Sequence, residues 1–256
     1  MYIKVHSKFI LTPLLNVLRD GVIACNSISD GIESFPMGEY YLQSLFLRMT
    51  GAQEQKMKCI CWELATNNYH YRYNYLKNSY GECSNYDQKN NVYKDMVSCI
   101  LEIDPNFQPK SIIEDIQISN KTISLKRKLP LSVLDVTKEI LSSSHLIYWD
   151  EEAYQFFTAY GDELINERAF DLSNKNFLSN RFQKYYKIII WNHRNRCAHN
   201  LMSYQQDLPS LDALTDKNRS YCNYFFRYAI LILIDEIFLL LYKKYISLID
   251  PYNFGD

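Results

Sequence analysis

Apolar positions recur at helical spacing along most of the N-terminal half. Four segments place apolar residues three and four positions apart, which is typical of one helix face: 9–23, 39–51, 52–68 and 93–103. Pro13 predicts a helix start or a kink within the first segment, and Gly51 predicts the end of the second. The third segment is then a separate helix or a bent continuation of the second. Residues 69–95 are polar and rich in Tyr and Asn, and they have no clear period.

The C-terminal half keeps the helical period and ends in a long apolar segment. Helices are expected at 131–144, 150–170, 179–201 and 219–248. The last one is apolar nearly all round, so it should be packed on several sides or lie at a subunit interface. Asp235 and Glu236 interrupt its apolar run, which favours a buried helix over a membrane span. The alternating residues 116–125 would suit one short β-hairpin.

These elements predict an all-α protein. Residues 131–256 are expected to form a four-helix core, with 1–130 as a helical extension or as part of the same bundle, because no Gly-, Ser- or Pro-rich linker divides them. Only 7 Gly and 7 Pro occur, which is too few for a many-turned β-sandwich. The 7 cysteines show no disulfide framework and the first residues do not resemble a signal peptide, so we expect a cytoplasmic protein with free thiols.

Charge is balanced over the whole chain but not locally. The net charge of −1 excludes a general binder of polyanions. Between Asp171 and Asp207, however, there is no acidic residue. This window contains basic side chains and interleaved aromatic ones, and the following are candidate RNA contacts: Arg181, Lys184, Tyr186, Lys187, Trp191 and Arg196. Such a stretch suits a phosphate backbone with unstacked bases. A cationic helix C-terminus explains part of the same pattern.

The same window ends in "WNHRNRCAHN", residues 191–200, which concentrates titratable groups after the apolar run "YYKIII". His193, Cys197 and His199 could in principle bind a metal, since residues four apart share a helix face. No carboxylate lies nearby, so no metal or other cofactor is expected. No phosphate-binding glycine loop and no H-E-x-x-H sequence occurs.

Within this stretch, Arg194, Asn195 and His199 form R-N-x3-H. Late on a bundle helix, after a basic and aromatic run, it resembles the signature of the HEPN superfamily of all-α ribonucleases, R-x4–6-H with a polar residue after the Arg. The resemblance implies that these three residues are catalytic. Several HEPN proteins add an E-x3-K pair, and Glu54 with Lys58 has that form. Glu54 and Lys58 are equally an ordinary i,i+4 surface pair.

Helix geometry does not by itself select Arg194. At about 100° per residue, Asn195 and His199 share a face, whereas Arg194 lies about 140° from His199. Arg194 therefore needs its long side chain or a distorted turn to reach the site, and Arg196 is the alternative phosphate contact.

The chemistry of RNA cleavage sets a further requirement. A metal-free ribonuclease needs a base for the 2′-OH, an acid for the leaving 5′-oxygen and a cation for the phosphate. A homodimer would supply a second His199, and His193 is the alternative within one chain.

The resulting hypothesis is a metal-independent endoribonuclease of HEPN type. By resemblance, it would act in toxin–antitoxin, phage-defence or stress responses, with RNA, a second copy and an antitoxin or other defence protein as partners and no membrane association. The alternative is a catalytically inactive helical module that binds RNA or another protein.

Overall fold

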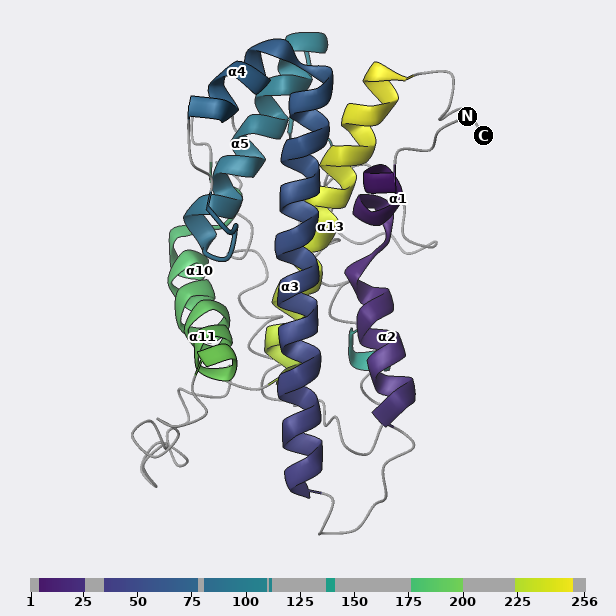
Figure 1. Ribbon diagram of the computed structural model, residues 1–256, viewed down its shortest axis with the longest axis vertical. Coiled ribbons are helices and arrows are strands. Elements are labelled where there is room, and N and C mark those ends of the chain that lie inside the picture. Colours follow the sequence, from purple (N-terminus) through teal and green to yellow (C-terminus); the bar gives the residue numbers. More distant parts are fainter. Residues whose placement is uncertain are drawn as a thin grey trace.

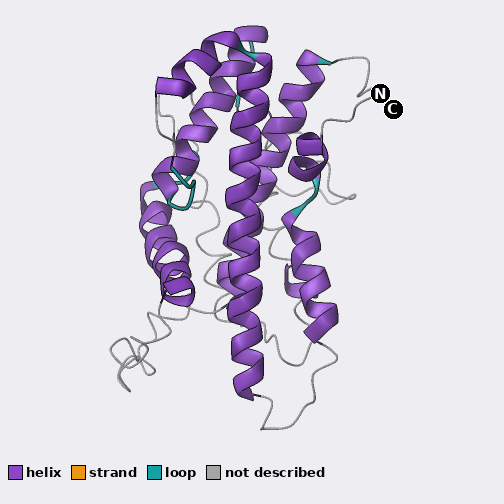
Figure 2. Cartoon of the chain, viewed as in Figure 1, coloured by secondary structure: helices purple, strands orange, loops and turns teal. Residues whose placement is uncertain are grey.

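The computed structural model describes residues 5–25, 35–77, 81–109, 111, 137–140, 176–199 and 224–250. All regular elements in these ranges are helices, which confirms the all-α class for them (Figures 1 and 2). The elements are α1 (Val5–Leu11), α2 (Leu14–Cys25), α3 (Phe35–Asn67), α4 (Tyr69–Lys77), α5 (Tyr86–Ile103), α10 (Asn180–Tyr185), the π-helix η3 (Tyr186–Trp191), α11 (Asn192–His199) and α13 (Tyr224–Ile249). Residues 137–140 are also helical. The rest of the helix expected at 131–144, the helix at 150–170 and the hairpin at 116–125 lie outside the described residues.

The longest helix, α3, runs through Gly51 and spans the length of the molecule (Figure 1). The helix end expected at Gly51 is therefore wrong, and segments 39–51 and 52–68 form one helix. Met49 and Met57 are fully buried on either side of the glycine. Packing of this kind outweighs the penalty of about 1 kcal/mol that glycine carries inside a helix.

Pro13 separates α1 from α2, as its position predicted. The first free backbone N–H of α2 is that of Leu14, and it donates to Asp235 Oδ2 on α13 at 2.6 Å. Gly21 allows α2 to approach α3 closely, because a Cβ atom there would lie 2.6 Å from the side chain of Leu45. The hydroxyl of Tyr41 on α3 donates to the carbonyl of Gly21 at 2.6 Å. Helix α2 is thus fixed on both α13 and α3.

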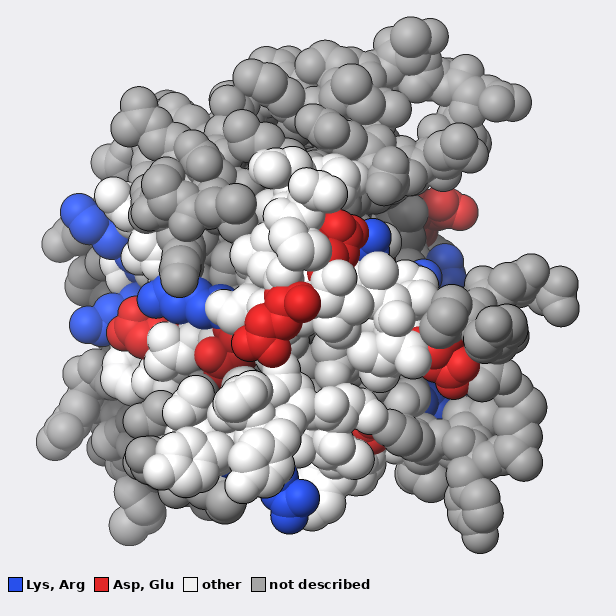
Figure 3. Space-filling model, turned by 90° about the horizontal axis from the view of Figure 1, so that it is seen from above, with Lys and Arg blue, Asp and Glu red and all other residues white. Residues whose placement is uncertain are grey.

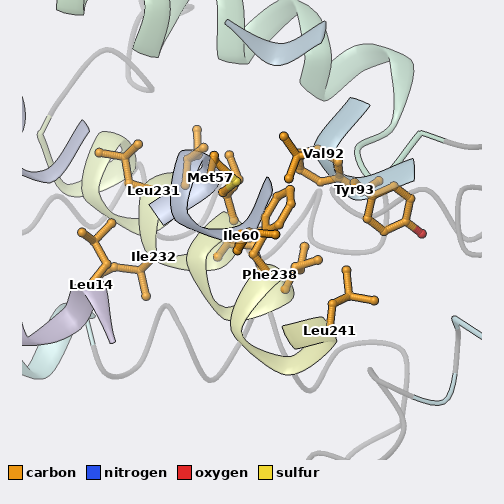
Figure 4. Close-up of a cluster of buried hydrophobic side chains, with 14 of the residues drawn as sticks. Leu14, Met57, Ile60, Val92, Tyr93, Leu231, Ile232, Phe238 and Leu241 are labelled. Carbon is orange, nitrogen blue, oxygen red and sulfur yellow. The ribbon is translucent and has the colours of Figure 1, made fainter. Parts of the chain in front are cut away.

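Helix α13 forms the centre of the core. Helices α1, α2, α3 and α5 from the N-terminal half all pack against it, which confirms the expectation of a helix packed on several sides (Figure 1). Figure 4 shows Leu231 and Phe238 of α13 among side chains of α3 and α5 such as Ile60 and Val92. Over the described ranges, none of the helices has a stretch with the length and apolarity that crossing a bilayer requires.

Candidate active site

The segment that contains R-N-x3-H is helical from Asn180 to His199, close to the expected 179–201. Ser179 caps its start, since its Oγ accepts a hydrogen bond from the backbone N–H of Phe182 at 3.3 Å. Phe182, Ile189 and Ile190 are buried and hold the segment on the core.

A buried asparagine on α5 anchors the residues that lead into this helix. Asn90 donates from Nδ2 to Asn176 Oδ1 at 2.7 Å and accepts from the backbone N–H of Phe177 at 3.2 Å. The hydroxyl of Tyr86, one turn earlier on α5, accepts from the N–H of Leu178 at 3.4 Å. Helix α5 therefore determines where the motif helix begins.

The middle of the motif helix is a π-helical turn, η3. The N–H of Asn192 bonds to the carbonyl of Lys187, five residues back, and Arg227 on α13 donates to the carbonyl of Ile189 at 3.4 Å. A π-turn changes the direction in which all following side chains point, and such turns are frequent at functional sites. The distortion expected near the motif thus exists, but it precedes Arg194 instead of lying within R-N-x3-H.

Arg194 extends from α11 to α3, where its Nη2 lies 3.3 Å from Glu54 Oε2. Its Nη1 lies 3.3 Å from Asn195 Oδ1. The Arg194 side chain is 26% exposed and that of Glu54 is 12% exposed, so the ion pair is half-buried and open to solvent on one side. The structure thereby joins a residue of R-N-x3-H to a residue of the E-x3-K pair, 140 positions apart in sequence.

Lys58 does not pair with Glu54, which corrects the expected i,i+4 pair. Its Nζ instead forms an ion pair with Glu82, in the turn before α5. This hydrogen bond raises the pKa of Lys58 and lowers the pKa of Glu82. The turn has a tight backbone, since Cys83 adopts a left-handed φ of 56°, a conformation uncommon for residues other than glycine. Both members of the E-x3-K pair are thus engaged by other elements.

Sequence reasoning missed a buried lysine on the neighbouring helix α5. Lys89 on α5 is 1% exposed, and it forms no direct ion pair within the described part of the chain. Burial lowers its pKa to about 8, and the charge of Glu54 partly opposes that shift. The available signal was its position: Lys89 lies three residues after Tyr86 and four before Tyr93, on the apolar face of the helix.

His193 is half-buried and packs against aromatic side chains. Its ring contacts Phe46 and Tyr224, and its Nε2 lies 3.3 Å from the Tyr224 hydroxyl and 3.5 Å from Cys197 Sγ. Burial, with lesser effects from Arg227 and Arg196, lowers its pKa to about 3. A ring that stays neutral at neutral pH cannot donate a proton as an imidazolium, which makes His193 unsuitable as the acid.

The third motif residue is placed only by its backbone. His199 ends α11, and its side chain is outside the described part of the structure. Among the residues that are described, no three His, Cys, Asp or Glu side chains are grouped so as to share a metal ion.

The expected RNA-contact residues divide into two groups. Lys184, Lys187 and Arg196 are exposed, as a contact surface requires. Tyr186 is 1% exposed, with its hydroxyl 3.3 Å from the carbonyl of Ser84, so the expectation that its ring can stack on a base is wrong. Trp191 is partly buried against the core, and the side chain of Arg181 is not described. Seen from above in Figure 3, acidic and basic side chains adjoin one another on the described surface.

Comparison with known proteins found no match to this chain among protein-family models, curated proteins or solved structures. The site thus contains the Arg194 guanidinium with two donor nitrogens, the Asn195 amide beside it, and the Glu54 carboxylate, which already occupies one of those donors. An incoming phosphate could replace that carboxylate, because guanidinium groups bind either oxyanion through the same donors.

Proposed function

We propose that this protein is a metal-independent endoribonuclease of HEPN type. The observation that carries the proposal is the contact between Arg194 and Glu54. The family resemblance points to Arg194 and, through the E-x3-K form, also to Glu54, and the two side chains meet although they are 140 positions apart in sequence. A surface ion pair formed by chance would not be expected to join a residue of R-N-x3-H on α11 to a residue of the E-x3-K pair on α3.

In the proposed reaction, neutral His199 takes the proton of the 2′-OH. The 2′-oxygen then forms a bond to phosphorus while the bond to the 5′-oxygen breaks, and a second acid protonates the leaving oxygen. The phosphate displaces the Glu54 carboxylate from Arg194, which then holds the non-bridging phosphate oxygens, and Asn195 orients either the phosphate or the imidazole. The products carry a 2′,3′-cyclic phosphate and a 5′-hydroxyl.

We propose a homodimer as the source of the second acid, because one histidine cannot serve as base and acid in a single step. A twofold axis near α11 would bring two copies of His199 together. Lys184, Lys187 and Arg196 would contact the RNA backbone. The setting that we propose is a toxin–antitoxin, defence or stress system in the cytoplasm, with RNA as substrate.

The test is cleavage of RNA by purified protein in EDTA, followed by analysis of the product ends and of the molecular mass by light scattering. We expect cyclic-phosphate ends, and complete loss of cleavage in His199→Ala. His70→Ala is the matched control, because His70 is exposed on α4 and should leave cleavage intact. Strict dependence on a divalent ion, or 5′-phosphate ends, would contradict the proposal. Binding of RNA without cleavage would favour the alternative of an inactive RNA-binding module.

A further inference from the structure

Helix α4 carries its tyrosines on two opposite faces. Tyr71 is 8% exposed, and its ring centroid lies 5.8 Å from that of the partly buried Tyr75. Tyr69 and Tyr73, by contrast, are 78% and 54% exposed. Because residues four apart share a helix face, the inner pair holds α4 on the core and the outer pair lies together on the surface. Burial in the core accounts for the inner pair but not for the outer one.

The helix that carries the outer pair is fixed at its start. Asn68 accepts a hydrogen bond at its Oδ1 from the backbone N–H of Tyr71 at 3.0 Å, and it donates from Nδ2 to Glu102 Oε2 on α5 at 2.5 Å. Asn68 thus caps α4 and joins it to α5. A ligand that contacts the outer tyrosines therefore need not order the helix first.

The exposed side chains of α4 are aromatic, basic or neutral, and α4 contains no Asp or Glu. They are Tyr69, His70, Arg72, Tyr73 and Asn74. At about 100° per residue, Arg72 lies within about 100° of both outer tyrosines, on the same side of the helix. Two aromatic rings beside a guanidinium suit single-stranded nucleic acid, because bases stack on the rings and the guanidinium binds phosphate. A purely apolar protein partner would leave the arginine without a counter-charge.

Helix α5 relates this surface to the motif helix. Asn90 of α5 holds the residues that lead into the motif helix, whereas Glu102 of α5 holds the start of α4. Glu102 follows Asn90 by 12 positions, which corresponds to about 18 Å along the helix axis. In Figure 1, α4, α10 and α11 follow one another down the same edge of the molecule. At about 3.4 Å per nucleotide of a stacked strand, covering that distance takes roughly five nucleotides or more.

We propose that the outer face of α4, formed by Tyr69, Arg72 and Tyr73, is a second contact surface for single-stranded RNA, at a distance from Arg194. The proposal says where the substrate of the proposed ribonuclease is held, and in that respect it rests on the proposed function. Bases stack on the two tyrosine rings, and Arg72 binds the backbone beside them. Duplex RNA cannot bind in this way, because its base faces are already stacked on one another. The surface therefore selects single strands that are long enough to reach from α4 to the motif helix.

The experiment measures binding without cleavage, so that its outcome does not depend on catalysis. Fluorescence anisotropy in EDTA is measured with labelled 2′-O-methyl RNA, which lacks the attacking 2′-OH. The probes are a single strand of about 20 nucleotides, a duplex of the same length and a strand of about 4 nucleotides, too short to cover both surfaces. The variants are Tyr69→Ala/Tyr73→Ala and Tyr69→Phe/Tyr73→Phe. Tyr40→Ala is the matched control, because Tyr40 is 73% exposed near the start of α3, at the opposite end of that helix from α4.

The double alanine variant should bind the long single strand at least about 10-fold more weakly than the native protein, since two bases lose their stacking partners. Tyr69→Ala alone, at the more exposed ring, should show a smaller loss of the same kind. The double phenylalanine variant keeps both rings and should bind as the native protein does, as should Tyr40→Ala. Native and alanine proteins should bind the duplex equally, and likewise the short strand. Thermal melting followed by circular dichroism checks that each variant is folded.

Native-like binding of the long strand by the folded double alanine variant would overturn this proposal, even if the native protein cleaves RNA. An equal loss of binding to the duplex would also overturn it, because stacking on α4 could not be the cause. A native protein that cleaves no RNA, but loses its binding of the long strand in the double alanine variant, would overturn the proposed function and support the α4 surface. Failure of the native protein to bind the long strand would overturn both.

Discussion

Two of the ion pairs on helix α3 can be compared directly, because their α3 residues, Glu54 and Lys56, are two positions apart and so face roughly opposite sides of the helix. Lys56 meets Asp235 of α13 at 2.6 Å, with the two side chains 5% and 2% exposed. Glu54 meets Arg194 of α11 at 3.3 Å, with 12% and 26% exposed. The first pair is short and sealed in the core, and the second is longer and accessible.

The difference between the pairs lies in what else each carboxylate holds. Asp235 uses its second oxygen to accept the N–H of Leu14, so it fixes the start of α2 as well as α3. Glu54 instead meets Arg194 through one carboxylate oxygen, Oε2. Removing one partner of the Lys56–Asp235 pair would leave an uncompensated buried charge, whereas a looser pair with an accessible cation can exchange one anion for another.

The largest effect should come from breaking the sealed pair. Asp235→Ala leaves Lys56 and the N–H of Leu14 without their acceptor, so we expect a loss of about 3–5 kcal/mol in the free energy of unfolding. Urea denaturation measures it. The double variant Lys56→Met/Asp235→Leu should recover most of the loss, because no unpaired charge remains. A loss below about 1 kcal/mol in Asp235→Ala would mean that this buried pair contributes no more to the free energy of unfolding than a surface ion pair does.

Breaking the accessible pair should act on activity instead of stability. Arg194→Ala is expected to lower kcat for RNA cleavage about 100- to 1000-fold, as removal of a transition-state donor does. Its unfolding free energy should change by less than about 1 kcal/mol. Arg196→Ala, two residues on and exposed, is the control and should mainly weaken binding in a salt-dependent way. Equal losses of kcat in both variants would remove the distinction between the two arginines.

The buried Lys89 on α5 should lower the stability of the fold. Its folded pKa of about 8 lies below the ordinary 10.5, so between these values the unfolded chain binds more protons. The free energy of unfolding should therefore rise with pH from about 8 to 10.5. Lys89→Met should lack this rise and should be more stable than the native protein at pH 7 by roughly 1–3 kcal/mol. Denaturation of both proteins across this range gives the difference curve, in which other titrating groups cancel. A variant less stable than the native protein at pH 7 would show that the lysine charge is compensated.

The smallest effect is expected at the outer edge of the cluster. Glu82→Gln removes the partner of Lys58, but the Glu82 side chain is 75% exposed and solvent replaces the contact. We expect an unchanged melting temperature and unchanged positions of the Arg194 NMR signals. A change in those signals would extend the site to the turn before α5.

Several features of the fold and the site follow from local sequence signals. Each of these features depends on a pattern within a few turns of one helix: the cap at Ser179, the break at Pro13 and the all-round burial of α13. The contact between Glu54 and Arg194 could not be predicted from local sequence, because no local pattern relates residues so far apart; only the E-x3-K form of the family resemblance pointed to Glu54.

The features that were not predicted depend on packing between distant segments. Gly51 ends no helix because buried side chains on both sides hold α3 together. Tyr186 and His193 have polar groups that suit a surface, and only the tertiary structure shows that Tyr186 is buried and that the His193 ring is half-buried against Phe46 and Tyr224. Lys89 interrupts the apolar face of α5, and this interruption is visible in the sequence without any motif.

The π-turn at Tyr186–Trp191 also has a consequence for how this helix could have arisen and how it can be altered. Such a turn accommodates one more residue than an α-helical turn does. The residues of R-N-x3-H therefore point in a different direction, relative to Ser179 and Phe182, than they would in an uninterrupted α-helix. Deletion of a single residue there, such as the half-exposed Ile188, would let the segment revert to an unbroken α-helix with Ser179 and Phe182 in place. Because the turn accommodates the extra residue locally, everything beyond such a deletion would keep its orientation, and Arg194 would still face Glu54. Conversion of the turn to an α-helix without a deletion would instead rotate Arg194 by about 100° about the helix axis. The orientation of Arg194 toward Glu54 therefore depends on the π-turn, in a part of the chain that contains neither R-N-x3-H nor the E-x3-K pair.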